Sequence, residues 1–291
     1  MKIEGVFVPL VTPFKNGEID FNSYKRIVDY YISKGVSGII PLATTGEIPT
    51  ISENEFEEIL EKTMEYNCNR VPVYVGVGGN NTSKVISRLK MVEKNKVNGI
   101  LSVCPYYNRP DQRGIFQHFL KISEATSLDV IIYNVPYRTG TNIENDTVYK
   151  LAEIENIVAI KDSCGDIRQT SNLLLNPPDN FSILTGEDIF YYTTLTLGGN
   201  GGILASAHLN TEEFIDIFNA VKNNNHQLAL EKWRSLSKFI PHLFKEPNPT
   251  PIKYCLNKLG IIDSPEVRLP LTEITAHLKE ILDKVCSINR G

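Results

Sequence analysis

The chain has 291 residues, of which 42% are hydrophobic and 22% are charged, and its formal net charge is -4. These fractions are ordinary for a globular protein with a sizeable core, so the composition excludes a wholly disordered chain. Lysine and arginine are dispersed along the chain, which leaves no basic patch that would indicate binding to nucleic acid. The composition therefore favours chemistry on a small molecule.

The N-terminus has no long apolar core ahead of a small-residue cleavage site, and no segment approaches the length of a membrane span. The five cysteines are an odd number, widely spaced, and include no C-x-x-C pair, so reduced thiols explain them most simply. We therefore expect a cytoplasmic protein that binds neither membrane nor nucleic acid.

Eight short apolar runs recur at the spacing of one strand plus one helix, and amphipathic, charged segments lie between them. Near-continuous apolar strands that alternate with helices are typical of a parallel sheet covered on both faces, and eight such units close a barrel. The sequence thus predicts a (β/α)8 TIM barrel over residues 1–225. The runs cover residues 5–10, 38–42, 71–77, 99–103, 130–133, 157–161, 181–184 and 202–205.

Helix signals support this pattern and continue beyond the last run. Ser52 and Glu55 form a capping box, and Thr211 opens another amphipathic segment. From about residue 226 onward the strand signals stop, and helical patterns follow around Trp233, over residues 254–259 and over residues 274–285. We expect a small, all-helical C-terminal domain over residues 226–291.

Catalytic side chains of such a barrel gather at the C-terminal ends of the strands, and Lys161 closes the sixth apolar run. Burial disfavours the charged form of a lysine, and a neutral amine is the nucleophile that carbonyl chemistry needs. Most lysines at strand ends simply extend to solvent, so the significance of Lys161 depends on its neighbours.

The fifth run ends in Tyr133, with Arg138 shortly after it, and Thr44 and Thr45 follow the second. An arginine can hold a substrate carboxylate through two parallel hydrogen bonds, while a phenol and hydroxyls can relay protons. Each residue alone could be an ordinary surface or packing residue. Together with Lys161 they predict one concave site that suits a 2-oxo acid.

Other chemistries lack their usual motifs. None of the five histidines closes a strand run or falls at H-x-x-x-H spacing, which disfavours metal catalysis and Ser-His-Asp chemistry. The glycine cluster over residues 76–80 lacks the lysine and hydroxyl residue of a P-loop and the G-x-G-x-x-G spacing. We interpret it as a tight turn between a strand and a helix.

The strand-end segments that carry Thr44, Tyr133, Arg138 and Lys161 resemble the dihydrodipicolinate synthase family, within the superfamily of pyruvate-dependent Schiff-base lyases and aldolases. The resemblance implies that Lys161 forms an imine with pyruvate, and that the derived enamine attacks L-aspartate 4-semialdehyde. Cyclisation would then free the lysine and give 4-hydroxy-tetrahydrodipicolinate for diaminopimelate and lysine biosynthesis, without a metal or organic cofactor. The matching segments are residues 44–47, 105–108, 133–139, 161 and 246–253.

The resemblance also implies a proton relay and an assembly. Tyr133, Thr44 and Tyr107 would relay protons, with Tyr107 reaching in from the neighbouring subunit of a tight dimer. Two such dimers would form a homotetramer.

For substrate binding, the resemblance implies that Thr45 holds the carboxylate of pyruvate and Arg138 that of the semialdehyde. The chain around Gly186 and Ile203 would line the pocket.

Two departures from the family pattern have consequences. Ala43 stands where the family commonly has glycine, which preserves the turn only if its φ is negative. Lysine-inhibited members carry histidine and glutamate side chains at positions that correspond to Glu53, Phe56 and Lys84. Because Phe56 and Lys84 cannot supply those contacts, we expect an enzyme that lysine does not inhibit.

Two alternatives stay open. A retro-aldol lyase of the same superfamily, which cleaves N-acetylneuraminate or a keto-deoxy sugar acid to pyruvate, shares the Lys-Asp-Ser pattern of residues 161–163. Arg138 favours the synthase, since a polyol substrate needs no second group to bind a carboxylate. A catalytically silent barrel that binds an oxo acid is the other alternative, and the set of Lys161, Tyr133, Thr44 and Tyr107 argues against it.

Overall fold

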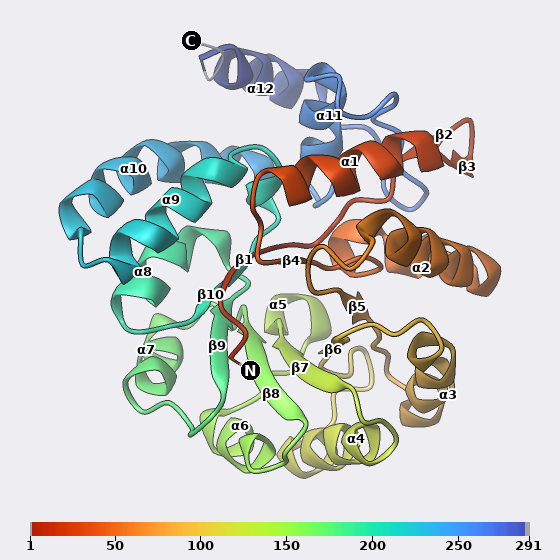
Figure 1. The fold of residues 1–291 in the computed structure, drawn as a ribbon, viewed down its shortest axis with the longest axis vertical. Coiled ribbons are helices and arrows are strands. Elements are labelled where there is room, and N and C mark those ends of the chain that lie inside the picture. Colours follow the sequence, from red (N-terminus) through yellow and green to blue (C-terminus); the bar gives the residue numbers. More distant parts are fainter. Residues whose placement is uncertain (1, 289–291) are drawn as a thin grey trace.

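The computed structural model describes residues 2–288, with side chains described as far as Lys284. At its centre lies an eight-stranded sheet in which every pairing is parallel (Figure 1). All eight predicted strands are present. In sheet order they are β4 (Gly38–Ile39), β1 (Gly5–Val8), β10 (Gly201–Ile203), β9 (Ser182–Thr185), β8 (Ile157–Asp162), β7 (Asp129–Asn134), β6 (Gly99–Val103) and β5 (Tyr74–Gly76).

The sheet closes on itself between β4 and β5. Ile39 and Val73 form a parallel bridge, and the Ile39 amide donates to the Pro72 carbonyl at 3.1 Å. Closure satisfies backbone groups that an open sheet would expose at its edges. The prediction of a (β/α)8 barrel is therefore confirmed. A separate two-stranded hairpin consists of β2 (Phe14–Lys15) and β3 (Glu18–Ile19).

Helices surround the barrel (Figure 1). At the predicted capping box, the Ser52 hydroxyl accepts from the Glu55 amide at 3.3 Å, and the Glu55 carboxylate accepts from the Ser52 amide at 2.9 Å. The helices of this part of the chain are α1 (Phe21–Ser33), α2 (Glu53–Asn67), α3 (Thr82–Glu93), α4 (Gln112–Glu124), α5 (Pro136–Thr139), α6 (Asn145–Ala152), α7 (Ile167–Leu175), α8 (Tyr191–Thr196) and α9 (Thr211–Lys222).

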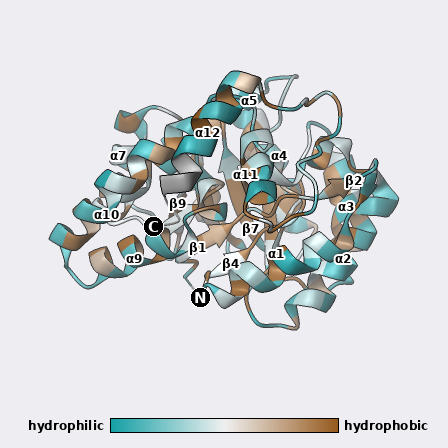
Figure 2. Cartoon of the chain, turned by 90° about the horizontal axis from the view of Figure 1, so that it is seen from above, coloured by the Kyte–Doolittle hydropathy of each residue, from teal (hydrophilic) through white to brown (hydrophobic). Residues whose placement is uncertain are grey.

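Apolar residues concentrate on the strands, while the helices carry polar residues on their outer faces (Figure 2). Buried apolar side chains form two clusters. The larger one lies between the sheet and the helices, and the smaller one fills the barrel interior. Ile131 and Ala159 belong to the interior cluster. Because side chains alternate along a strand, residues 133 and 161, two positions further on, also face the interior. This alternation directs Tyr133 and Lys161 toward the mouth of the barrel.

The described part of the chain beyond residue 225 is helical, as predicted, with α10 (His226–Phe239), α11 (Thr250–Lys258) and α12 (Ala276–Ile288). Helix α10 packs directly on α8 and α9, so a domain boundary at residues 225 and 226 stays a prediction. Across residues 2–288, no helix is both long and apolar enough to cross a membrane. The side chain of Cys286 lies outside the described residues, and Cys68, Cys104 and Cys164 are free thiols.

Candidate active site

Lys161 lies near the C-terminal end of β8, beside Tyr133 of β7. Its side chain is only 6% exposed, and Nζ lies 4.3 Å from the centroid of the Tyr133 ring. Within residues 2–288, no group accepts a hydrogen bond from this nitrogen. Burial lowers the pKa of Lys161 to about 8; the carboxylate of Asp188 opposes this shift and the Arg138 guanidinium adds to it. The site thus holds an amine that deprotonates readily.

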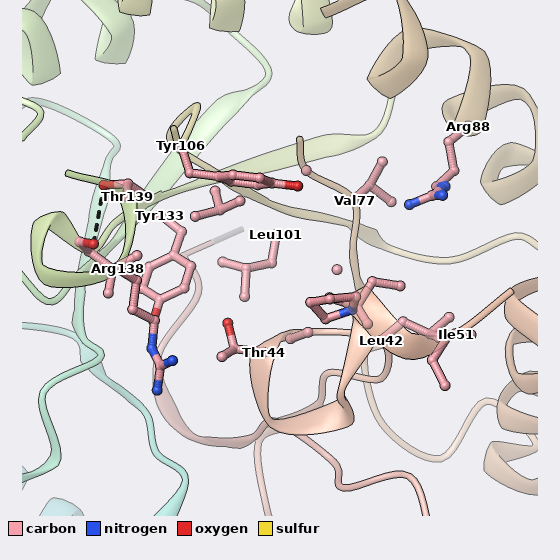
Figure 3. A pocket seen from close by; sticks show the side chains of 17 residues that line it. Leu42, Thr44, Ile51, Val77, Arg88, Leu101, Tyr106, Tyr133, Arg138 and Thr139 are labelled. Atoms are coloured by element: carbon pink, nitrogen blue, oxygen red, sulfur yellow. Dashed lines mark hydrogen bonds between the residues drawn. The ribbon is translucent and has the colours of Figure 1, made fainter. Parts of the chain in front are cut away.

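A cavity of about 420 Å³ opens at this end of the barrel and is lined by Tyr133, Thr44 and Arg138. Figure 3 shows these three side chains on one side of the cavity and Arg88 at its far end. Burial raises the pKa of Tyr133 above its ordinary value, so the phenol keeps its proton at neutral pH. Tyr133 can therefore donate a proton to an oxygen that gains negative charge.

The loop after β4 carries Thr44 and Thr45 in a single 3-10 turn, Thr44–Gly46. Ala43 precedes this turn with a φ of -96°, so alanine is accommodated as expected. Thr45 is buried, and its hydroxyl accepts a hydrogen bond from Asn248 Nδ2 at 3.0 Å. The turn exposes Thr44 to the cavity and holds Thr45 behind it.

A buried ion pair anchors the same loop. Lys253 Nζ lies 2.7 Å from Glu47 Oε1, both side chains are fully buried, and Lys253 also donates to the Thr12 carbonyl at 2.8 Å. Glu47 adopts a left-handed conformation with a φ of 57°. The pair joins α11 to the Thr44 turn, and sequence reasoning missed it because 206 positions separate the partners.

Gly186 follows β9 and lies against the nucleophile. A Cβ atom at this position would lie 2.4 Å from Lys161 Cε and 2.5 Å from Ser163 Oγ, so no side chain fits there. Ile203 is fully buried in the interior cluster that also contains Tyr133. Gly186 thus makes room for Lys161, and Ile203 packs within the barrel interior.

Arg138 projects from α5, the turn after β7. Its guanidinium carbon lies 5.3 Å from the centroid of the Tyr137 ring, and its side chain is exposed. It lines the 420 Å³ cavity and also an adjoining groove of about 470 Å³. An anion bound in either space can therefore reach the guanidinium.

Tyr107 is the one predicted site residue that lies apart. Its side chain is 89% exposed, its φ is 73°, and it does not line the cavity of its own chain, whereas Tyr106 does. Of the other predicted residues, Thr44, Tyr133 and Arg138 line the cavity, Gly186 lies against Lys161, Thr45 is bonded to Asn248, and Ile203 packs in the same cluster as Tyr133.

Two acidic residues near the nucleophile received no role in the sequence analysis. Asp188 is buried and accepts hydrogen bonds from the amide of Ser206, at 2.6 Å, and from its hydroxyl. Burial raises the pKa of Asp188, and burial likewise raises that of its half-buried neighbour Glu187. The sequence feature that could have identified both residues is their position directly after Gly186, at the C-terminal end of a strand.

Potential metal ligands do not gather at this site. Over residues 2–288 no three histidine, cysteine, aspartate or glutamate side chains lie close enough together to hold a metal ion.

The chain is similar to known proteins along nearly its whole length. The family model for the dihydrodipicolinate synthetase family matches residues 2–288. A 4-hydroxy-tetrahydrodipicolinate synthase 2 from Clostridium acetobutylicum is 61% identical over 284 residues, which cover 98% of this chain and 99% of that protein.

Two solved structures show the same architecture. Dihydrodipicolinate synthase from Thermotoga maritima has 37% sequence identity and a TM-score of 0.95, with 99% of this chain and 98% of that chain covered. A chloride-inhibited dihydrodipicolinate synthase from Acinetobacter baumannii, solved in complex with pyruvate, has 33% identity and a TM-score of 0.95, with 98% of each chain covered. With the family model and these relatives in agreement, the chain belongs to the dihydrodipicolinate synthetase family.

Proposed function

We propose that the chain is a 4-hydroxy-tetrahydrodipicolinate synthase, which condenses pyruvate with L-aspartate 4-semialdehyde in the biosynthesis of diaminopimelate and lysine. The observation that carries the proposal is Lys161, a buried amine without a hydrogen-bond acceptor among the described residues, beside a cavity lined by a phenol, a hydroxyl and a guanidinium. The 61% identity to a synthase over almost the full length supports the same activity.

The first step forms the imine. The neutral amine of Lys161 attacks the ketone carbon of pyruvate, and loss of water leaves the C=N bond. With a pKa of about 8, roughly a quarter of the amine is neutral at pH 7.5, against about 0.1% at the ordinary value of 10.5. Burial therefore raises the concentration of the nucleophile by about two orders of magnitude.

The second step forms the carbon–carbon bond. The imine loses a methyl proton to give an enamine, which attacks the aldehyde carbon of the semialdehyde. The phenol of Tyr133 stays protonated at neutral pH and can donate this proton to the more basic new alkoxide, and Thr44 lies on the same side of the cavity to pass protons onward. The substrate amine then attacks the imine carbon, closes the ring and releases Lys161.

Two groups would bind the substrate carboxylates. We assign the carboxylate of pyruvate to Thr45, whose hydroxyl is oriented by Asn248, and that of the semialdehyde to Arg138. Gly186 and Ile203 shape the pocket around the imine.

Tyr107 would complete the proton relay from a second copy of the chain. Its 89% exposed side chain, projecting from a backbone with a φ of 73°, is available to such a partner. The smallest competent unit would then be a dimer, and we propose a homotetramer of two such dimers in the cytoplasm. Dilution to monomers, followed by light scattering, should lower turnover in a rate assay. Circular dichroism should show that the barrel stays folded.

An assay with both substrates tests the proposed activity. The wild-type chain, given pyruvate and L-aspartate 4-semialdehyde, should consume them in equal amounts and form the cyclic product, which mass spectrometry detects. Arg138→Ala should lose most of this activity, and Arg138→Lys should retain more. No product from the wild type, or release of pyruvate from a sugar acid that survives Arg138→Ala, would favour the lyase instead.

A further inference from the structure

The groove of about 470 Å³ beside the active-site cavity is lined by two cations, Arg138 and Lys245, and by three carboxylates, Glu187, Asp188 and Glu246. Arg138 comes from the turn after β7, and Glu187 from the turn after β9. Arg138 and Glu187 form no ion pair with each other. The charge of Arg138 acts to lower the pKa of Glu187, and the charge of Glu187 acts to raise the pKa of Lys161. The groove therefore keeps a cation and an anion apart.

Neither charge is neutralised by a close contact within residues 2–288. The Arg138 guanidinium only stacks on the Tyr137 ring, and no donor there hydrogen-bonds to the half-buried Glu187 carboxylate. The backbone of Glu187 is nonetheless fixed, since its amide donates to Thr185 Oγ1 at 3.1 Å and its carbonyl accepts from the same hydroxyl at 3.0 Å. Glu187 is thus held in place with its carboxylate free.

The other carboxylates of the groove are already engaged. Asp188 accepts from Ser206, and Glu246 accepts from both the amide and the hydroxyl of Thr275. A partly buried carboxylate without a donor is unfavourable, and burial raises the pKa of Glu187 accordingly. Glu187 is therefore the groove carboxylate that a bound cation would stabilise.

We propose that Glu187 binds the α-ammonium group of the second substrate while Arg138 binds its α-carboxylate, so that the groove selects an α-amino-acid semialdehyde. This inference rests on the proposed synthase function and adds the group that recognises the amine. An α-amino acid carries both charges on one carbon. In the groove, Glu187 is the carboxylate without a donor among residues 2–288, and Arg138 is the cation that also lines the active-site cavity, whereas Lys245 lines the groove alone. A sugar acid or a simple oxo acid has no ammonium group, and its binding would leave Glu187 without a partner.

The experiment compares two aldehydes that differ only in the amine. The KM of L-aspartate 4-semialdehyde and the inhibition constant of succinic semialdehyde are measured at saturating pyruvate for wild type and Glu187→Gln. Loss of a hydrogen bond between charged groups should raise the KM of the amino aldehyde by about tenfold or more. The inhibition constant of succinic semialdehyde should change less than about twofold, because it lacks the group that Glu187 binds.

Two further variants and a wild-type measurement complete the test. Glu187→Asp, which keeps the charge, should restore much of the selectivity, and Glu246→Gln should leave the ratio of the two constants unchanged. In the wild type, L-2-aminobutyrate should inhibit more strongly than butyrate, again by about tenfold.

Equal changes for both aldehydes, no change for either, or equal inhibition by the two acids would overturn the assignment of Glu187. These results are distinguishable from failure of the proposed function, in which the wild type itself would give neither a pyruvyl adduct nor the cyclic product.

Discussion

Lys161 and Lys253 are both buried lysines near the mouth of the barrel, and they share several properties. Each ammonium nitrogen lies 4.3 Å from the centroid of an aromatic ring, that of Tyr133 for Lys161 and that of Phe14 for Lys253. Burial lowers the pKa of both below the ordinary value for lysine. Burial and a neighbouring ring therefore do not by themselves distinguish a nucleophile from a structural residue.

Hydrogen bonding separates the two. Lys253 donates to Glu47 and to the Thr12 carbonyl, whereas Lys161 has no acceptor in the described part of the chain. Donation to a carboxylate favours the charged form of Lys253 and fixes its geometry. Lys161 is free to lose its proton and to attack. In this barrel the buried lysine that donates hydrogen bonds, Lys253, has a structural role. The buried lysine without an acceptor among the described residues, Lys161, is the proposed nucleophile.

The largest effect is expected from Lys161→Met. Removal of the nucleophile should lower the rate of condensation by at least ~10³-fold, because the covalent route is lost. The melting temperature should not fall, since the variant removes a buried amine that makes no hydrogen bond within residues 2–288. Steady-state kinetics and thermal unfolding measure the two effects, and a variant that keeps substantial turnover would contradict the assignment.

Lys253→Met should have the reverse profile. It leaves the Glu47 carboxylate buried without its partner, which should lower the free energy of unfolding by about 3–5 kcal/mol. Denaturant unfolding measures this change. The double variant Lys253→Met/Glu47→Leu should recover part of the loss, because no unpaired charge remains. A double variant less stable than the single one would show that the pair contributes more than mutual neutralisation.

Gly186→Ala tests how closely the site is fitted around Lys161. The added Cβ would meet Lys161 Cε at 2.4 Å and displace the amine, which should slow imine formation by about 10²-fold. Gly79→Ala is the matched control, since its Cβ would meet the nearest atom at 3.4 Å. Similar rates of borohydride-trapped adduct formation in both variants would rule out a steric role for Gly186.

The pH dependence of imine formation reports the pKa of Lys161. Only the neutral amine attacks, so the rate at limiting pyruvate should rise about tenfold per pH unit well below the pKa. It should level off above a pH of about 8. Stopped-flow measurement of adduct formation gives this profile. A rate that continues to rise up to pH 10 would mean that burial does not lower the pKa.

Lysine should have the smallest effect, which is none. Phe56 is buried beneath the Arg88 guanidinium at 4.9 Å, Arg88 forms an ion pair with Glu53, and exposed Lys84 would repel a cationic ligand. Initial rates with and without millimolar lysine test this expectation. Half-inhibition in that range would refute it.

The eight strands and their order were predictable because the apolar runs have a regular spacing. Their ends were less so: the first run was expected to extend to Leu10, but β1 ends at Val8. Pro9 follows Val8 and has no amide proton to continue the ladder. A count of apolar residues does not register that missing donor.

Placement of Lys161 and Tyr133 was predictable, because alternation along a strand fixes which side chains face the barrel mouth. The contacts of Lys253 with Glu47 and of Asn248 with Thr45 were not. They depend on how the segment over residues 246–253 docks against a loop about 200 positions earlier. No local pattern encodes that docking.

Borohydride reduction in the presence of pyruvate, followed by peptide mass mapping, tests the distinction between the two lysines most directly. The account predicts a reduced pyruvyl adduct on Lys161 and none on Lys253. Lys161 has no acceptor among the described residues and lies beside Tyr133, which lines the cavity, whereas Lys253 donates to Glu47. An adduct on Lys253, or no adduct on Lys161, would contradict it.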